Sequence, residues 1–385
     1  MRVFSVVVAV LALATLAGVV VLWPGNVESG IAEGVLVDSE RGTVERVEET
    51  VCPGLIGQDC KQVFVRLESG PESGELVQLQ LGGQGFDPDV DPGDEVRVTK
   101  TPEPAPGAEP LAGTGYGFVD FERRGTMLWL AGLFVAAVLV LGRLRGALSL
   151  LGLAASLALV LVFVVPSILD GNSPLAVAVT GSLAIALVTI PLAHGRGPKS
   201  LAALLGTAGS LLLTAGLAVV FTELTHLTGL SSEEAVFLQL GQADLSLEGL
   251  LLAGMVIGAL GVLDDVTISQ ASTVLALRRA NPALGFRELF GRALHVGRDH
   301  VSATVNTLVL AYVGAGLPAL LLFSAADLGV SEVANFEIVA KEIVATLVGS
   351  IGLICAVPIT TGLAAWLALN EDPDELSAEG SAHAH

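Results

Sequence analysis

Two adjacent aspartates, Asp264 and Asp265, lie near the centre of a long apolar run from Leu250 to Leu277. A charged side chain at the centre of a bilayer costs at least about 2.5 kcal/mol on insertion scales. On a helix, Asp265 shares a stripe with small residues, which let another helix approach closely. The members of this stripe are Gly254, Gly258, Gly261, Asp265, Ser269, Ser272 and Ala276. We therefore expect Asp265 to be the buried acid that binds and releases a proton or a cation, and Asp264 to share its proton or to face water.

A second interpretation of the same run stays open. A span could end near Leu263, and the two aspartates would then cap a separate cytoplasmic helix. Each of the two pieces, Leu250–Leu263 and Val266–Leu277, is short for a full span, because crossing a bilayer takes about 20 residues of helix.

The next apolar run opens with the polar sequence Gly297-Arg-Asp-His-Val-Ser-Ala-Thr-Val-Asn-Thr307. Helical spacing places Asp299 and Asn306 on one face, and His300 and Thr307 on another. Histidine titrates near neutral pH, which suits a proton path. In the alternative interpretation this end of the helix is interfacial and its hydroxyls bond backbone carbonyls. The candidates for proton or ion coupling are therefore Asp265, Asp264, Asp299, His300, Asn306, Thr307 and Ser269.

Other chemistry finds little support in the sequence. It contains no Walker loop, no Gly-x-Ser-x-Gly, no Cys-x-x-Cys and no His-Glu-x-x-His. His295, Asp299 and His300 do not share one clean helix face, so we expect no metal site. We also expect no cofactor and no enzymatic activity. The net charge of −20 argues against nucleic-acid binding, which needs a basic surface.

Cys52 and Cys60 lie close together in a polar segment that contains no histidine. Such a pair predicts a disulfide if the segment faces an oxidising compartment. The alternative, a metal-binding pair, would need further cysteine or histidine ligands nearby.

The elements that position these residues are membrane helices. Hydrophobic residues make up 52% of the chain, charged residues only 15%, and the mean hydropathy is +0.72; a soluble domain has about 25% charged residues. We interpret Val3–Leu22 as an uncleaved anchor rather than a signal peptide. Seven further apolar runs follow: Met127–Leu141, Ala147–Pro166, Leu175–Leu192, Leu201–Phe221, Leu250–Leu277, Val301–Phe323 and Ile343–Leu369. These runs predict a polytopic α-helical membrane protein with about eight transmembrane helices.

Basic residues in the short loops alternate in a way that predicts the topology. Arginine and lysine recur in every second loop, whereas the intervening short loops hold only Lys341. The positive-inside rule then places both termini in the cytoplasm and residues 24–124 outside the membrane, which supports the disulfide. We expect a multi-pass protein of the bacterial plasma membrane.

The segment Pro24–Arg124 carries 20 acidic and 8 basic residues, a net charge of −12. Short alternating or β-branched stretches predict strands at Val35–Val37, Val44–Val47, Val63–Leu67, Leu76–Leu81 and Glu95–Thr99. Asp91–Asp94 predicts a turn and Thr101–Gly107 a stiff linker. We expect a small OB-like barrel or β-sandwich. The predicted organisation is an anchor at 1–23, an extracytoplasmic β-rich domain at 24–124, a seven-helix domain at 125–370 and a disordered acidic cytoplasmic tail at 371–385.

The layout resembles the YibE/F-like family of bacterial membrane proteins. Two motifs carry the resemblance, one from Gly258 to Gln270 and one from Gly297 to Tyr312. A weaker resemblance links the chain to the membrane halves of RND-type proteins, including SecD and SecF. This chain departs from that second pattern by two extra spans and a much smaller external domain. The YibE/F-like resemblance implies a class of membrane protein and no particular activity.

Two functions are compatible with these sequence features. The midplane acids favour a secondary transporter or a proton- or ion-coupled permease for an unidentified solute or ion. The alternative is a non-transporting accessory or assembly protein, whose external domain binds a protein of the cell envelope. In both, the lipid bilayer is the immediate partner.

Overall fold

The structure is a computed structural model. It describes residues 2–25, 38–52, 59–82, 88–100, 115–241, 245–326 and 328–370. The chain divides into two compact units. One unit consists of residues 1–29 and 141–385, and the other consists of residues 30–140.

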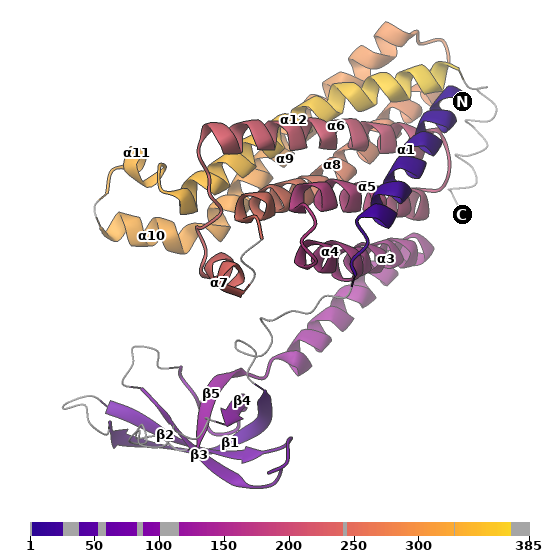
Figure 1. Cartoon of the computed structure of the whole chain (residues 1–385). Helices are drawn as coiled ribbons and strands as arrows, with labels where there is room; N and C mark the ends of the chain where they lie inside the picture. The colour runs from indigo at the N-terminus through magenta and orange to yellow at the C-terminus, as the bar shows by residue number, and fades with distance from the viewer. Residues whose placement is uncertain are drawn as a thin grey trace. The chain divides into compact units, whose positions relative to one another are not determined.

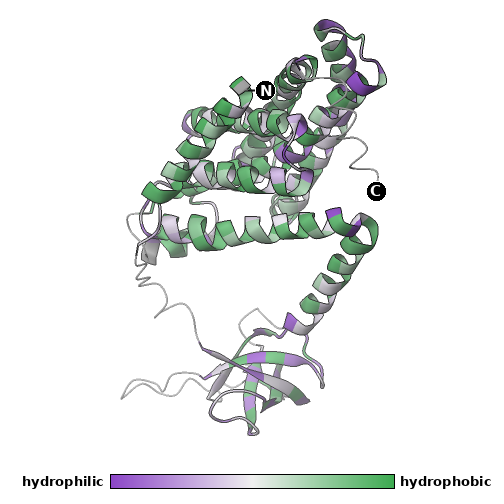
Figure 2. Ribbon diagram, turned by 90° about the vertical axis from the view of Figure 1, so that its right-hand side faces the viewer, coloured by the Kyte–Doolittle hydropathy of each residue, from purple (hydrophilic) through white to green (hydrophobic). Residues whose placement is uncertain are grey.

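The smaller unit contains one antiparallel sheet with the strand order β3-β2-β1-β4-β5. The strands are β1 (Ser39–Val51), β2 (Asp59–Leu67), β3 (Leu76–Leu81), β4 (Glu95–Lys100) and β5 (Tyr116–Phe121). Alternate side chains point to one face, where Val63, Val65, Val96 and Val98 form a buried core. Figure 2 shows the same alternation of hydrophobic and hydrophilic residues along the sheet.

Four of the five predicted strands are confirmed, since they lie within β1 to β4. The predicted strand Val35–Val37, the linker Thr101–Gly107 and the tail 371–385 lie outside the described residues. Strand β5 was not predicted, because its short aromatic stretch follows a long proline- and glycine-rich segment. The OB-like barrel or sandwich stays a prediction.

The predicted turn at Asp91–Asp94 is confirmed. The backbone N–H of Asp91 donates to Asp94 Oδ2 at 2.9 Å, and Gly93 has a φ of 100°, which favours glycine. This turn leads directly into β4.

The predicted Cys52–Cys60 disulfide is present in the structure. It lies where β1 and β2 stop pairing, beside the pairs Thr50–Cys60 and Val51–Asp59. Both cysteines are buried. The bridge therefore ties the end of this hairpin to the core of the domain.

A polar cluster around Glu72, in the turn between β2 and β3, connects the two edges of the sheet. Its carboxylate accepts hydrogen bonds from Lys100, at the end of β4, and from the Tyr116 hydroxyl at 2.5 Å. The hydrogen bond from Lys100, with that from Tyr116, lowers the pKa of Glu72. Burial, with the hydrogen bond to Glu72, raises the pKa of Tyr116. The cluster fastens β5 beside the β2–β3 turn and so curls the sheet.

The larger unit is a helical bundle (Figure 1). Its principal helices are α1 (Arg2–Val21), α5 (Pro174–His194), α6 (Pro198–Leu224), α8 (Leu247–Ala280), α9 (Phe286–Ala315) and α12 (Glu337–Leu369). The shorter elements are a π-helical turn at Val160–Val164, α4 (Val165–Leu169), α7 (Glu233–Gly241), α10 (Leu317–Ala325) and α11 (Val330–Val333). The helix α3 (Arg124–Leu159) begins in the smaller unit and ends in the larger one.

Among the described residues, six helical segments are long and apolar enough to cross a membrane. A seventh is added if α9 and α10, which are bent by 60° relative to each other, count as one span. The predicted count of eight is not reached, because the runs Met127–Leu141 and Ala147–Pro166 fall within a single segment of 46 residues. That segment is interrupted at Arg143, whose φ of 50° lies in the left-handed region.

Helices α6, α8 and α12 pack side by side at the centre of the bundle (Figure 1). The approach of α6 to α12 depends on two glycines that face threonines. A Cβ on Gly352 would lie 2.0 Å from Thr214 Oγ1, and a Cβ on Gly206 would lie 2.1 Å from Thr360 Oγ1. Neither glycine can accept a side chain unless the helices or the threonines move.

We predict that Gly352→Ala destabilises the bundle by about 1–3 kcal/mol, the usual cost of overpacking. The readout is the free energy of unfolding of the full chain in detergent micelles. Gly216→Ala on α6 is the matched control, since a Cβ there meets nothing within 4 Å. Adding Thr214→Ala to Gly352→Ala should restore part of the lost stability. Equal stability of Gly352→Ala and the wild type would contradict this packing.

We further predict that only one of the three cysteines is reactive before reduction. Cells are treated with a membrane-permeant alkylating agent, and the denatured full chain is then weighed by mass spectrometry. One alkyl group, on Cys355, is expected without reductant, because Cys355 is the free cysteine. Three are expected after reduction, and Cys355→Ser should take none before it. Three alkyl groups without reductant would show that Cys52 and Cys60 are thiols in the cell.

Candidate functional site

The two central aspartates lie near the midpoint of α8, with opposite exposures from those predicted. Asp264 is half-buried, and its Oδ1 has no accessible surface and no hydrogen-bond partner. Asp265 is exposed. The prediction that Asp265 is the buried acid is therefore wrong, and Asp264 takes that place.

The rotation of α8 explains this difference. Its buried face consists mainly of aliphatic residues such as Val256, Leu263 and Val266, which pack against α5, α6 and α12. Gly254, Gly258 and Gly261 lie on the exposed face, together with Asp265. Small residues therefore do not mark the buried face of this helix.

The helix is continuous through both aspartates. It starts at the N-cap Ser246, whose Oγ accepts from the N–H of Gly249 at 3.0 Å, and it ends at Ala280. The interpretation in which Asp264 and Asp265 cap a second helix is therefore wrong.

Next to Asp264, a hydrogen-bonded pair of hydroxyls joins α8 to α6. Thr267 Oγ1 donates to the Asp264 carbonyl oxygen at 3.1 Å, and lies 2.6 Å from Thr207 Oγ1. A hydroxyl has one proton, so Thr207 donates in this pair. Both threonines are fully buried. The backbone at Asp264 is thus held within the core, while its side-chain oxygen has no partner.

One turn further, Gln270 joins three helices. Its Nε2 donates to the carbonyl oxygen of Ala293 on α9 at 2.9 Å, and to Thr361 Oγ1 on α12 at 2.7 Å. A Cβ on Gly297 would lie 2.7 Å from Gln270 Oε1, so this glycine lets α9 approach. This hydrogen-bond network was not predicted from the sequence. The signal was a glutamine in an apolar run, three residues after Thr267 and therefore on the same helix face.

The candidates on α9 are arranged differently. His300 is half-buried and its Nε2 has no hydrogen-bond partner, whereas Asp299, Asn306 and Thr307 are exposed. The Thr307 hydroxyl donates to the Ala303 carbonyl oxygen at 3.0 Å, as the interpretation of an interfacial helix expected. Ser269 on α8 is half-buried. Among the described residues, no hydrogen bond or ion pair joins these α9 side chains to the aspartates of α8.

Of the candidate residues, Asp264 is therefore the one whose side chain is best placed to bind a proton or a cation. A carboxylate oxygen without a partner in the interior is costly when ionised, and a proton or a cation removes that cost. A second negative charge on the adjacent Asp265 opposes ionisation further. Asp264 can thus act as a reversible acceptor of a proton or of a small cation.

A known protein family matches the helical part of the chain. The family described as YibE/F-like protein matches residues 130–370, which include both motifs and every helix from α5 to α12. No curated protein and no solved structure gives a significant match, and the weaker resemblance to RND-type membrane halves gains no support. The match covers more than half of the chain, which therefore belongs to the YibE/F-like family.

Proposed function

We propose that the chain is a multi-pass protein of the bacterial plasma membrane with eight spans, cytoplasmic termini and an extracytoplasmic domain at residues 24–124. The apolar helices and the alternation of basic loops support this topology. Arg143 supports a break within α3, because a charged residue with left-handed φ suits a chain reversal at a membrane surface. The two segments of α3 then become two spans.

Within this topology, we propose that the protein is a secondary transporter or a proton- or ion-coupled permease. The observation that carries the proposal is the half-buried Asp264, whose Oδ1 lacks a partner at the midpoint of a membrane helix. Ionisable residues in spans most often mark paths for protons or ions.

The residues around Asp264 have separate roles in this proposal. Asp264 holds the coupling proton or cation, and the exposed Asp265 supplies a second carboxylate on the next residue of the helix. Thr267 and Thr207 hold the backbone of α8 in place while the charge of Asp264 changes. Among the described residues, the Nε2 of His300 is also buried without a hydrogen-bond partner, so His300 is the first residue to test as a relay.

The expected outcome for the full chain in liposomes is that Asp264→Asn abolishes a carboxyl band of the infrared spectrum whose intensity changes with pH. Asp265→Asn is the matched control and should keep this band, because Asp265 is exposed. In liposomes loaded with a pH-sensitive dye, Asp264→Asn should slow proton movement at least about tenfold, as removal of a proton-transfer group does.

Two results would contradict the transport proposal. The first is an unchanged band in Asp264→Asn, which would mean that this side chain is ionised and solvated. The second is a rate of proton movement that is unchanged in each of three single variants, Asp264→Asn, Asp265→Asn and His300→Gln. The accessory role, in which an envelope protein binds residues 24–124, would then be the better-supported function.

A further inference from the structure

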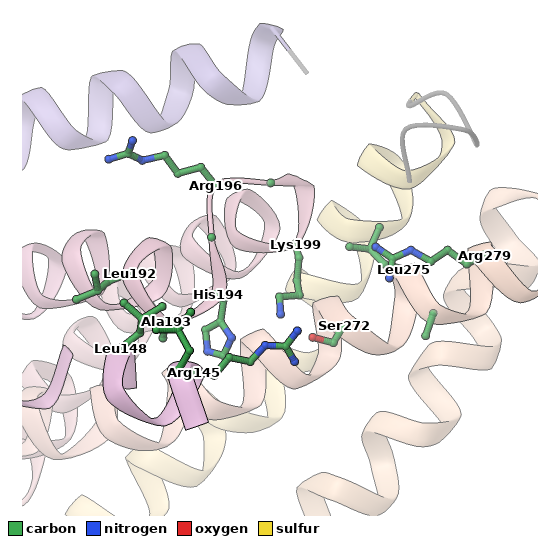
Figure 3. A pocket seen from close by; sticks show the side chains of 14 residues that line it. Arg145, Leu148, Leu192, Ala193, His194, Arg196, Lys199, Ser272, Leu275 and Arg279 are labelled. Carbon is green, nitrogen blue, oxygen red and sulfur yellow. The ribbon is translucent and has the colours of Figure 1, made fainter. Parts of the chain in front are cut away.

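A cavity near the start of α8 differs in charge from a larger cavity near its end. In the larger cavity, of about 700 Å³, the charged residues of the lining are basic, such as Arg145 and Lys199 (Figure 3). The smaller cavity, of about 300 Å³, is lined by residues of both signs, Lys341 and Glu342. The positive-inside rule accounts for basic residues at the cytoplasmic end of the bundle. It does not account for Lys341, the one basic residue in the short loops that we place outside.

The smaller cavity lies between the N-terminal parts of α8 and α12, the end of α9 and the loop before α7. Hydrogen bonds to Glu337, in the first turn of α12, hold this loop. The Glu337 carboxylate accepts from the backbone N–H of Thr228 at 3.0 Å and of Gly229 at 2.7 Å, and from the Thr228 hydroxyl at 2.8 Å. Gly229 packs against α8, since a Cβ there would collide with the Leu247 carbonyl oxygen. These contacts fix one wall of the cavity.

Lys341 and Glu342 differ from Glu337 because their charges have no partner. Both side chains are half-buried, and no hydrogen bond or ion pair joins either of them to another described residue. Neighbouring residues of a helix lie about 100° apart around its axis, so the two charges do not face each other. Partly buried charges are costly without a counter-charge. A ligand that carries both signs of charge can neutralise the two residues at once.

We propose that this cavity binds a small zwitterion of the α-amino-acid class, with its carboxylate on Lys341 and its ammonium group on Glu342. A simple anion or cation would leave one of the two charges without a partner, whereas a zwitterion satisfies both. The Tyr312 hydroxyl adds a further hydrogen-bonding group to the lining. The apolar part of the lining suits an aliphatic side chain, and it consists mainly of Leu247, Leu250, Leu251 and Met255.

This assignment names a class of solute for the transport proposed above and rests on that proposal. Gly254 lines the cavity and lies about 15 Å along α8 from Asp264. The Tyr312 hydroxyl lies 3.5 Å from the position of a Cβ on Gly258, one turn closer to Asp264. The solute site and the coupling acid are therefore on the same helix but separate, and each can be tested without the other.

Equilibrium binding of radiolabelled leucine to the full chain, purified in a neutral detergent, tests the proposal. Leucine is the probe because its side chain matches the apolar lining. Two competitors each lack one charge: leucinamide has no carboxylate, and 4-methylpentanoate has no ammonium group. We expect leucine to bind saturably, and each competitor to bind at least about tenfold more weakly, because each loses a charge-assisted hydrogen bond.

Single variants show which residue binds which group. Lys341→Gln should bind leucine and leucinamide about equally, and Glu342→Gln should bind leucine and 4-methylpentanoate about equally. Lys341→Arg keeps the charge, so it should bind leucine within a few-fold of wild type, and it remains informative if a glutamine variant does not fold. Arg287→Gln and Glu332→Gln are the matched controls at exposed residues outside the cavity, and both should bind leucine as the wild type does.

The absence of saturable leucine binding, or equal affinity of the wild type for all three ligands, would overturn this proposal. Binding is measured at equilibrium without a gradient, so Asp264→Asn should bind leucine as the wild type does. Failure of the coupling role of Asp264 would therefore leave leucine binding intact. Failure of the solute site would instead leave the effect of Asp264→Asn on proton movement unchanged.

Discussion

The close approach of α6 to α12 is the constraint on which the rest of the helical unit depends. In a membrane, burying apolar surface between helices gains little over lipid, so intimate packing and hydrogen bonds must hold the helices together. Gly206 and Gly352 allow this contact because each faces a threonine of the other helix. Helix α8 packs against both helices, and its rotation follows from theirs. That rotation decides which aspartate turns inward.

The buried polar groups that lack a hydrogen-bond partner differ in the free energy that this lack costs. The hydroxyls of Ser210, Ser350 and Thr360 also lack hydrogen-bond partners in the core of the bundle. A neutral hydroxyl without a partner costs on the order of 1–3 kcal/mol, whereas an isolated charge costs far more. Thr267 and Gln270 are satisfied by neighbouring helices. Asp264 is therefore set apart from its surroundings by its charge, which is why it is the acid to test.

The sequence alone predicted those features that depend on local pattern. Hydropathy located each apolar run, spacing identified the Cys52–Cys60 pair, and turn chemistry identified Asp91–Asp94. It failed where long-range packing decides the outcome. The small-residue stripe of α8 favoured Asp265 as the buried acid, but the buried face is set by contacts with α6 and α12 from distant parts of the chain.

Helix α8 places its two adjacent aspartates in different surroundings. The side of α8 that carries Asp265 continues about two turns to the half-buried Ser272 and about three turns to the exposed Ala276. Asp264 lies about 100° around the helix from Asp265, where it is half-buried and its Oδ1 has no hydrogen-bond partner. The two adjacent aspartates thus differ in exposure because the rotation of α8 turns one toward neighbouring helices and leaves the other exposed, which the stripe of small residues does not reveal.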